Sequence, residues 1–155
     1  MTKELSFYTN NSDETLSLGR KFADTISAGC LIFLDGELGT GKTTFMRGFM
    51  RGLGFLGKVK SPSYSLLEQY TLDLTINHFD LYRFKSSSEW EDAGFNEFIN
   101  STDVNVIEWP EKAIDVLPTP DLTVFFTYIQ QGGRSIKFKS LSSRGEKCKI
   151  GRAHV

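Results

Sequence analysis

A short apolar run at residues 30–34 leads directly into the glycine-rich stretch Gly-Glu-Leu-Gly-Thr-Gly-Lys-Thr at positions 36–43. Glycines permit a tight turn whose consecutive backbone N–H groups can surround an anion without obstruction by side chains. The spacing is that of a Walker A phosphate-binding loop. We therefore predict nucleotide contacts from the loop and the residue after it, that is from Gly36, Glu37, Leu38, Gly39, Thr40, Gly41, Lys42, Thr43 and Thr44.

Two side chains of this loop carry most of the predicted chemistry. Lys42 is expected to reach the outer phosphates as a point charge, and the Thr43 hydroxyl is expected to coordinate Mg²⁺. The alternative is a chance match. The context disfavours it, because residues 44–53 repeat apolar side chains at helical spacing and Gly54 can end that helix.

Length and composition indicate one domain. The chain has 155 residues, of which 39% are hydrophobic, enough for a single core. We expect this domain to span residues 1–146, followed by a basic and poorly ordered tail at 147–155. No apolar run approaches the roughly 18 residues of a membrane span, and the first residues lack the apolar core of a signal peptide. A cytoplasmic protein with no membrane partner is expected, with Cys30 and Cys148 as free thiols.

Charge is distributed unevenly along the chain. The net charge is −1, but seven basic residues and one acid follow position 130, giving +6 there and −7 before it. Residues 86–121 are strongly acidic. A protein or RNA partner could recognise such a field. A solvated face and a frayed end are the alternative that we favour over a nucleic-acid site, and DNA binding is not expected.

The order of predicted elements indicates an α/β fold. We expect a mixed β-sheet like that of P-loop NTPases, flanked by helices, with parallel strands around the loop and antiparallel hairpins beside them. The predicted strands are 5–9, 30–34, 63–71, 75–82, 104–107, 121–130 and 134–141. The predicted helices are 12–27, one from the loop to about residue 54, and one or two short helices in 86–100, broken at Gly94.

Two acids lie at predicted strand ends, where a metal bound opposite the loop hydroxyl needs a ligand. Asp80 ends 76–80 and Glu108 ends 104–108. We predict Thr43, Asp80 and Glu108 as metal ligands, and Lys42, Asp80 and Glu108 as catalytic residues. The alternative for each acid is a structural role, because strands often end in an acid that caps the next helix. The sequence leaves open which of the two positions the attacking water.

The segment Ser61, Pro62, Ser63 and Tyr64 follows the loop helix and offers hydroxyl groups beside a stiff proline. It is a candidate switch that senses the terminal phosphate, or else an ordinary turn. Trp109 follows Glu108, so its indole is expected either over the site or against a partner. His78 is expected to be structural rather than catalytic.

Four blocks together resemble the bacterial TsaE (YjeE) family, whose members are the ATPase subunits of the machinery that makes threonylcarbamoyladenosine in tRNA. They are the loop at 36–44, Ser-Pro-Ser-Tyr-Ser-Leu-Leu-Glu at 61–68, His-Phe-Asp-Leu-Tyr-Arg at 78–83 and Ile-Glu-Trp-Pro-Glu-Lys at 107–112. The similarity extends from about Phe7 to Glu146. Ser63 stands where the family usually has threonine; it keeps the hydroxyl.

The resemblance implies a weak Mg²⁺-dependent ATPase that is stimulated by its partners. It implies that ATP binding and hydrolysis switch a complex of TsaD and TsaB and let that complex turn over repeatedly. The threonylcarbamoyl transfer to position 37 of tRNA itself belongs to TsaD, so the resemblance implies contact with tRNA only through the complex. It also implies that Asp80 has the Walker B role, that Glu108 is an acid of the site and that Trp109 is a nucleotide-site residue on which the family depends.

Other functions stay open on the residues alone. A stand-alone small-molecule kinase would need an arginine-rich lid, whereas residues 84–103 are acidic. A GTPase would carry an Asn-Lys-x-Asp motif, which is absent from the sequence, so ATP is favoured. A non-enzymatic ATP-binding module is the fourth possibility.

Overall fold

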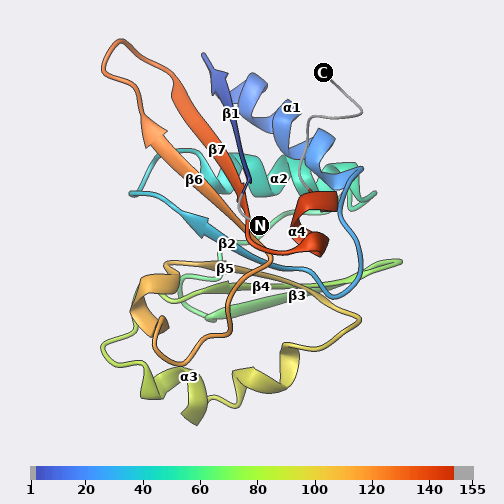
Figure 1. The fold of residues 1–155 in the computed structure, drawn as a ribbon, viewed down its shortest axis with the longest axis vertical. Coiled ribbons are helices and arrows are strands. Elements are labelled where there is room, and N and C mark those ends of the chain that lie inside the picture. Colours follow the sequence, from blue (N-terminus) through green and yellow to red (C-terminus); the bar gives the residue numbers. More distant parts are fainter. Residues whose placement is uncertain (1–2, 149–155) are drawn as a thin grey trace.

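The computed structural model describes residues 3–148, which form a mixed sheet with helices on both faces (Figure 1). The sheet has the strand order β1-β7-β6-β2-β5-β4-β3. The strands are β1 (Lys3–Thr9), β2 (Leu31–Asp35), β3 (Leu67–Thr71), β4 (Thr75–Asp80), β5 (Val104–Glu108), β6 (Leu122–Tyr128) and β7 (Arg134–Ser140). The helices are α1 (Ser12–Ala23), α2 (Lys42–Gly52), α3 (Ser88–Asp92), α4 (Ser143–Cys148) and the 3₁₀ turns η1 (Phe95–Phe98) and η2 (Pro110–Ala113).

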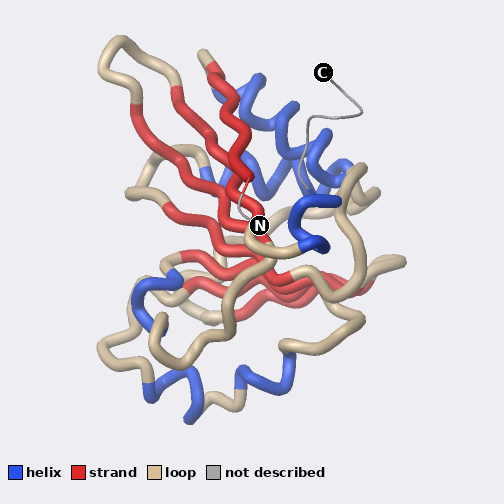
Figure 2. Tube along the Cα trace, viewed as in Figure 1, coloured by secondary structure: helices blue, strands red, loops and turns tan. Residues whose placement is uncertain are grey.

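The predicted α/β class and mixed sheet are confirmed. Strands β6, β2, β5 and β4 are parallel, while β3 and β7 join them as antiparallel partners through two hairpins. Strand β1 pairs antiparallel with β7 at the edge. Figure 2 shows how far the strand direction turns across the sheet, as the right-handed twist of strands requires.

Each face of the sheet carries its own apolar core. On one face α1 and α2 cover a cluster rich in phenylalanine, in which the ring centroids of Phe22 and Phe49 lie 5.3 Å apart. On the other face α3 and η1 supply Trp90 and Phe95, which pack around Phe79 of β4. Both faces of the parallel strands are therefore buried, which explains the continuous apolar run of β2.

Several predicted boundaries were wrong, each for a local reason. The helix predicted to reach residue 27 ends at Ala23, because the chain turns there and the Thr25 N–H bonds the Phe22 carbonyl. The strand predicted from residue 63 starts at Leu67, because Leu66 has a left-handed backbone with φ 69°. The strand predicted to reach residue 82 ends at Asp80, because the Asp80 carboxylate accepts the Tyr82 N–H and turns the chain.

The C-terminal helix α4 was not predicted. It includes residues 147 and 148, the first two of the predicted tail, and residues 149–155 lie outside the described residues. Cys148 and Cys30 are both fully buried in the same apolar cluster, and both cysteines are free, as predicted. This shared cluster joins α4 to the start of β2.

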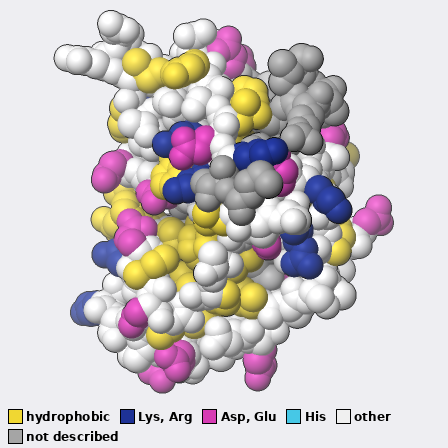
Figure 3. Space-filling view, viewed as in Figure 1, with side chains coloured by type: hydrophobic (Ala, Val, Ile, Leu, Met, Phe, Trp, Pro, Cys, Tyr) yellow, Lys and Arg dark blue, Asp and Glu magenta, His cyan; other side chains and the backbone are white. Residues whose placement is uncertain are grey.

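Basic and acidic side chains are interspersed on the face that Figure 3 shows. Two basic side chains of the C-terminal third pair with acids: Lys137 with Glu4 and Arg144 with Asp121. Within residues 3–148, no helix is long and apolar enough to cross a membrane.

Candidate functional site

The predicted loop follows β2, which lies between β5 and β6 in the sheet. Gly39 and Gly41 have φ values of 79° and 107°, a left-handed conformation that glycine adopts without steric cost. The Thr40 hydroxyl donates to the Glu37 carbonyl at 2.6 Å, and the Lys42 ammonium donates to the Gly36 carbonyl at 2.5 Å. These bonds hold the loop curved around the start of α2.

The two predicted acids end neighbouring parallel strands. Asp80 of β4 and Glu108 of β5 are register partners, so the pairing of the sheet alone brings them together. Both are largely buried. Burial raises the pKa of Asp80 above its ordinary value, and the nearby charge of Glu108 raises it further, although hydrogen bonds from the Tyr82 N–H and the Ser63 hydroxyl oppose this shift.

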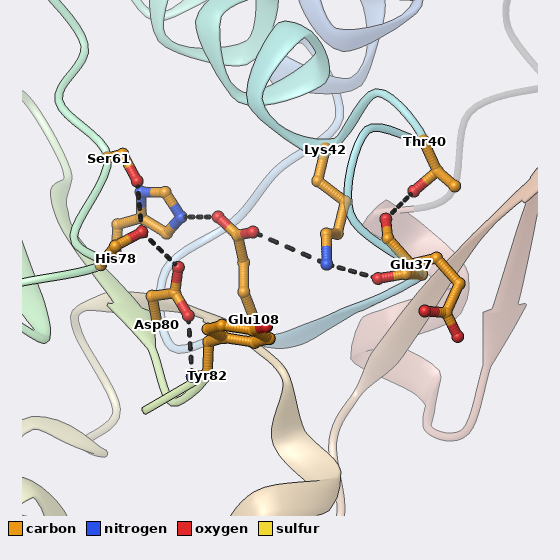
Figure 4. A network of polar contacts seen from close by, with 10 residues as sticks. Glu37, Thr40, Lys42, Ser61, His78, Asp80, Tyr82 and Glu108 are labelled. Carbon is orange, nitrogen blue, oxygen red and sulfur yellow. Dashed lines mark hydrogen bonds and ion pairs between the residues drawn. The ribbon is translucent and has the colours of Figure 1, made fainter. Parts of the chain in front are cut away.

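Glu108 lies between His78 and Lys42, as Figure 4 shows. One carboxylate oxygen, Oε2, is 2.5 Å from His78 Nε2, and the other, Oε1, is 4.0 Å from Lys42 Nζ. All three side chains are less than 10% exposed. His78 was expected to be structural; it is buried, but it also contacts an acid of the site.

Trp109 lies over the same lysine. Its ring centroid is 4.2 Å from Lys42 Nζ, close enough for a cation–π contact, and 4.9 Å from the ring centroid of Tyr82. Of the two orientations expected for Trp109, the structure thus shows the indole packed over the loop lysine. The residue has a left-handed backbone with φ 57°, an uncommon conformation for a residue with a side chain.

Lys42, Asp80, Glu108 and Trp109 line one cavity of about 450 Å³, within the range of about 300–1,000 Å³ typical of small-molecule sites. Most of the predicted site residues contribute to its wall, namely Leu38, Gly39, Gly41, Lys42, Thr43, Thr44, Ser61, Ser63, Asp80, Glu108 and Trp109. Gly36, Glu37 and Thr40 lie outside that lining and shape the loop through the bonds described above. The Glu37 carboxylate points away from Glu108 (Figure 4).

The candidate switch segment contacts the site through its serines. Ser63 donates to an Asp80 carboxylate oxygen at 3.2 Å, and its hydroxyl is 2.8 Å from that of Ser61. Pro62 is buried, while Tyr64 is 84% exposed and stacks on Arg83. The segment is therefore coupled to the carboxylate on one side and open to solvent on the other.

The far wall of the cavity was missed by sequence reasoning. It consists of Asn10, Asn11, Ser12 and Thr15 from the β1–α1 junction and of Gly133 and Arg134 from the β6–β7 hairpin. The Arg134 guanidinium donates to the Gly39 carbonyl at 3.1 Å and stacks on Tyr128, whose hydroxyl donates to the same carbonyl at 2.8 Å. No local motif marks these residues, because only the strand order β1-β7-β6-β2 brings them to the loop.

The donor set suits a hard cation. Residues 3–148 contain no cluster of three or more His, Cys, Asp and Glu arranged for a metal ion. Two carboxylates and the Thr43 hydroxyl line the cavity instead, and oxygen donors of this kind, few in number, are what Mg²⁺ uses when phosphates complete its shell. A cation would also offset the burial and the Glu108 charge that together raise the Asp80 pKa.

Comparison with known proteins identifies the family. Residues 9–136 match the model of the family described as "Threonylcarbamoyl adenosine biosynthesis protein TsaE". The chain belongs to the TsaE family. A protein of Haemophilus influenzae named "tRNA threonylcarbamoyladenosine biosynthesis protein TsaE" is 35% identical over 150 residues, covering 93% of this chain and 94% of that protein. The Bacillus subtilis protein of the same name is 32% identical over 145 residues, covering 93% and 90%.

A solved structure agrees with this membership. The crystal structure of Bacillus subtilis YdiB superposes with a TM-score of 0.82 at 29% sequence identity, covering 96% of this chain and 93% of that one. The two structures therefore share one fold over nearly the whole of this chain.

Proposed function

We propose that this chain binds ATP with Mg²⁺ in the cavity, hydrolyses the ATP, and acts in the biosynthesis of threonylcarbamoyladenosine at position 37 of tRNA. The observation that carries the proposal is the convergence of Lys42, Thr43, Asp80 and Glu108 on one cavity. Membership of a family whose relatives are named for tRNA threonylcarbamoyladenosine biosynthesis supports the pathway.

In this proposal the residues have separate tasks. The loop N–H groups and Lys42 hold the phosphates. Thr43, Asp80 and Glu108 hold Mg²⁺, which would neutralise charge on the transferred phosphoryl group. One carboxylate also orients the attacking water. Glu108 is the better candidate, because both Asp80 oxygens already accept hydrogen bonds, from Ser63 and the Tyr82 N–H, whereas Glu108 keeps Oε1 on the cavity side, 4.0 Å from Lys42 Nζ.

The far wall is the proposed place for the ribose and base. In this proposal the phosphates occupy the loop at one end of the cavity, and Asn10, Asn11 and Ser12 line the other side. Arg134 Nε is buried and has no hydrogen-bond partner within residues 3–148, which leaves it free to donate to a ligand. Asn10→Ala should weaken ATP binding more than it weakens binding of inorganic triphosphate.

The partner role follows from family resemblance. We propose that the ATP and ADP forms bind a TsaD–TsaB complex with different affinities, because a switch can exert only that difference. Ser61 and Ser63 link Asp80 to the exposed Tyr64, a route by which loss of the terminal phosphate would reach the surface.

The decisive experiment is ATP turnover by the purified chain, measured with and without TsaD and TsaB. We expect slow Mg²⁺-dependent hydrolysis by the chain alone and faster hydrolysis with both partners. Phosphate transfer from ATP to a metabolite instead of water would contradict the proposal and favour a kinase. A pull-down in ATP, in ADP and without nucleotide tests the switch, which fails if all three retain the partners equally.

A further inference from the structure

We propose that His78 is a positioning residue for hydrolysis, holding Glu108 so that a single carboxylate oxygen faces the nucleotide. The proposal rests on the proposed ATPase function. In the register of β4 against β5, His78 is paired with Val106. Two residues further along both strands, Asp80 is paired with Glu108. His78 and Glu108 are thus diagonal neighbours on one face, a separation that long side chains can bridge.

The contact between them is close and shielded from water. His78 is 2% exposed and its Nε2 lies 2.5 Å from Glu108 Oε2. A charge-assisted hydrogen bond of this kind is roughly twice as strong as a neutral one. It fixes the glutamate rotamer, and Oε1 then remains on the cavity side, 4.0 Å from Lys42 Nζ.

The second ring nitrogen indicates which atom carries the hydrogen. His78 Nδ1 is buried and has no hydrogen-bond partner within residues 3–148. A hydrogen on Nδ1 would be an unpaired buried donor and would leave the Nε2 lone pair facing a carboxylate oxygen, so both nitrogens would be unfavourably placed. The arrangement therefore assigns the hydrogen to Nε2, which donates to Glu108.

Three substitutions separate positioning from a merely structural role. His78→Leu removes the donor, whereas His78→Gln can present an amide N–H near the position of Nε2. Asn77→Leu is the matched control: Asn77 is equally buried on β4 but bonds Asn105 and Asp103 on the opposite face of the sheet. Melting temperatures of all three report whether the fold is intact.

We expect His78→Leu to lower kcat by about 10–100-fold, as loss of a group that orients an active-site ligand does, with the ATP dissociation constant little changed. His78→Gln should recover most of that loss, and Asn77→Leu should lower the melting temperature without a selective loss of kcat. Equal losses in the Leu and Gln variants, or a loss confined to ATP affinity, would overturn the proposal.

A nucleotide-free measurement keeps this test distinct from that of the proposed function. The chain has two histidines, so His154→Gln leaves only the His78 imidazole. Long-range proton–nitrogen NMR should then show the hydrogen on Nε2, whether or not the chain hydrolyses ATP. A hydrogen on Nδ1 would refute the positioning role, whereas a wild-type chain without ATPase activity would refute the proposed function and leave the NMR result standing.

Discussion

Trp109 has a left-handed backbone conformation, which directs its indole over Lys42 at 4.2 Å. Such conformations cost on the order of 1–3 kcal/mol and persist where the surrounding structure enforces them. The other tryptophan, Trp90, is fully buried in the core beneath α3, donates to Asn96 and does not line the cavity. A nucleotide in the cavity should therefore perturb the fluorescence of only one of the two indoles.

We predict that ATP changes the tryptophan fluorescence of the wild-type chain and of Trp90→Phe, and that Trp109→Phe abolishes the change. Because phenylalanine keeps an aromatic face near Lys42, and the cation–π contact is worth about 0.5–2 kcal/mol, the affinity of Trp109→Phe should fall by less than about tenfold. Titration followed by fluorescence and calorimetry checks both statements. A signal that survives in Trp109→Phe would place the ligand elsewhere.

Asp80 illustrates how a site residue can destabilise its own fold. Burial raises its pKa above 3.8, so the folded chain binds this proton more tightly than the unfolded chain does. The stability that protonated Asp80 contributes is therefore present below its pKa in the unfolded chain and is lost as the pH rises through its pKa in the folded chain. Above that range the ionised, buried carboxylate lowers the free energy of unfolding.

Asp80→Asn should accordingly raise the melting temperature at neutral pH by a few degrees, since each kcal/mol shifts the melting temperature of a chain of this size by about 2–4 °C. The same substitution should abolish ATP hydrolysis. The gain should shrink as the pH is lowered toward 4. Thermal denaturation across pH 4–8 without nucleotide measures it, and Asp73→Asn removes the same charge from an exposed turn as a control. A less stable Asp80→Asn at neutral pH would contradict this account.

At the scale of elements, α1 and α2 approach so closely that their contact depends on glycine. A Cβ built on Gly48 of α2 would lie 2.0 Å from the Leu16 carbonyl oxygen of α1, and one on Gly19 would lie 2.2 Å from the Phe45 carbonyl oxygen. Both obstacles are backbone atoms, which cannot rotate away. The start of α2 carries Lys42, so this spacing also sets the position of the loop against the sheet.

We predict that Gly48→Ala destabilises the fold by about 1–3 kcal/mol, the usual cost of overpacking, even though alanine favours a helix by about 1 kcal/mol over glycine. Arg47→Ala, on the exposed side of the same helix, should change stability by less than about 0.5 kcal/mol. Urea denaturation of both variants tests the difference. Equal stabilities would show that the helices can separate at little cost.

Sequence reasoning succeeded where the signal is local and failed where it depends on which strands become neighbours. The loop at 36–43 and the strand ends at Asp80 and Glu108 were found because their patterns lie within a few residues. His78 was not linked to Glu108, since that contact needs the register of β4 against β5. Arg134 was read as part of a basic segment, since only the placement of β7 beside β6 brings it to Gly39.

At the scale of the whole molecule, the cavity joins segments that are distant in sequence. Its wall includes Asn10 after β1, the loop after β2, the ends of β4 and β5, and Arg134 at the start of β7. These strands are distributed across most of the sheet. Unfolding of either the β3–β4 or the β6–β7 hairpin would therefore open the site. Ligand binding should accordingly be coupled to the folding of the entire domain rather than to the folding of one part of it.

We predict that Mg²⁺ and ATP at about 100 times the dissociation constant stabilise the chain by about 2.7 kcal/mol. For this size of domain the melting temperature should rise by about 5–10 °C. A single calorimetric transition should shift as a whole, because the ligand binds only when both sides of the sheet are folded. Lys42→Gln should abolish the shift, whereas Lys139→Gln, at a β7 position outside the cavity lining, should retain it. Two separating transitions would mean instead that the edge strands and the loop fold independently.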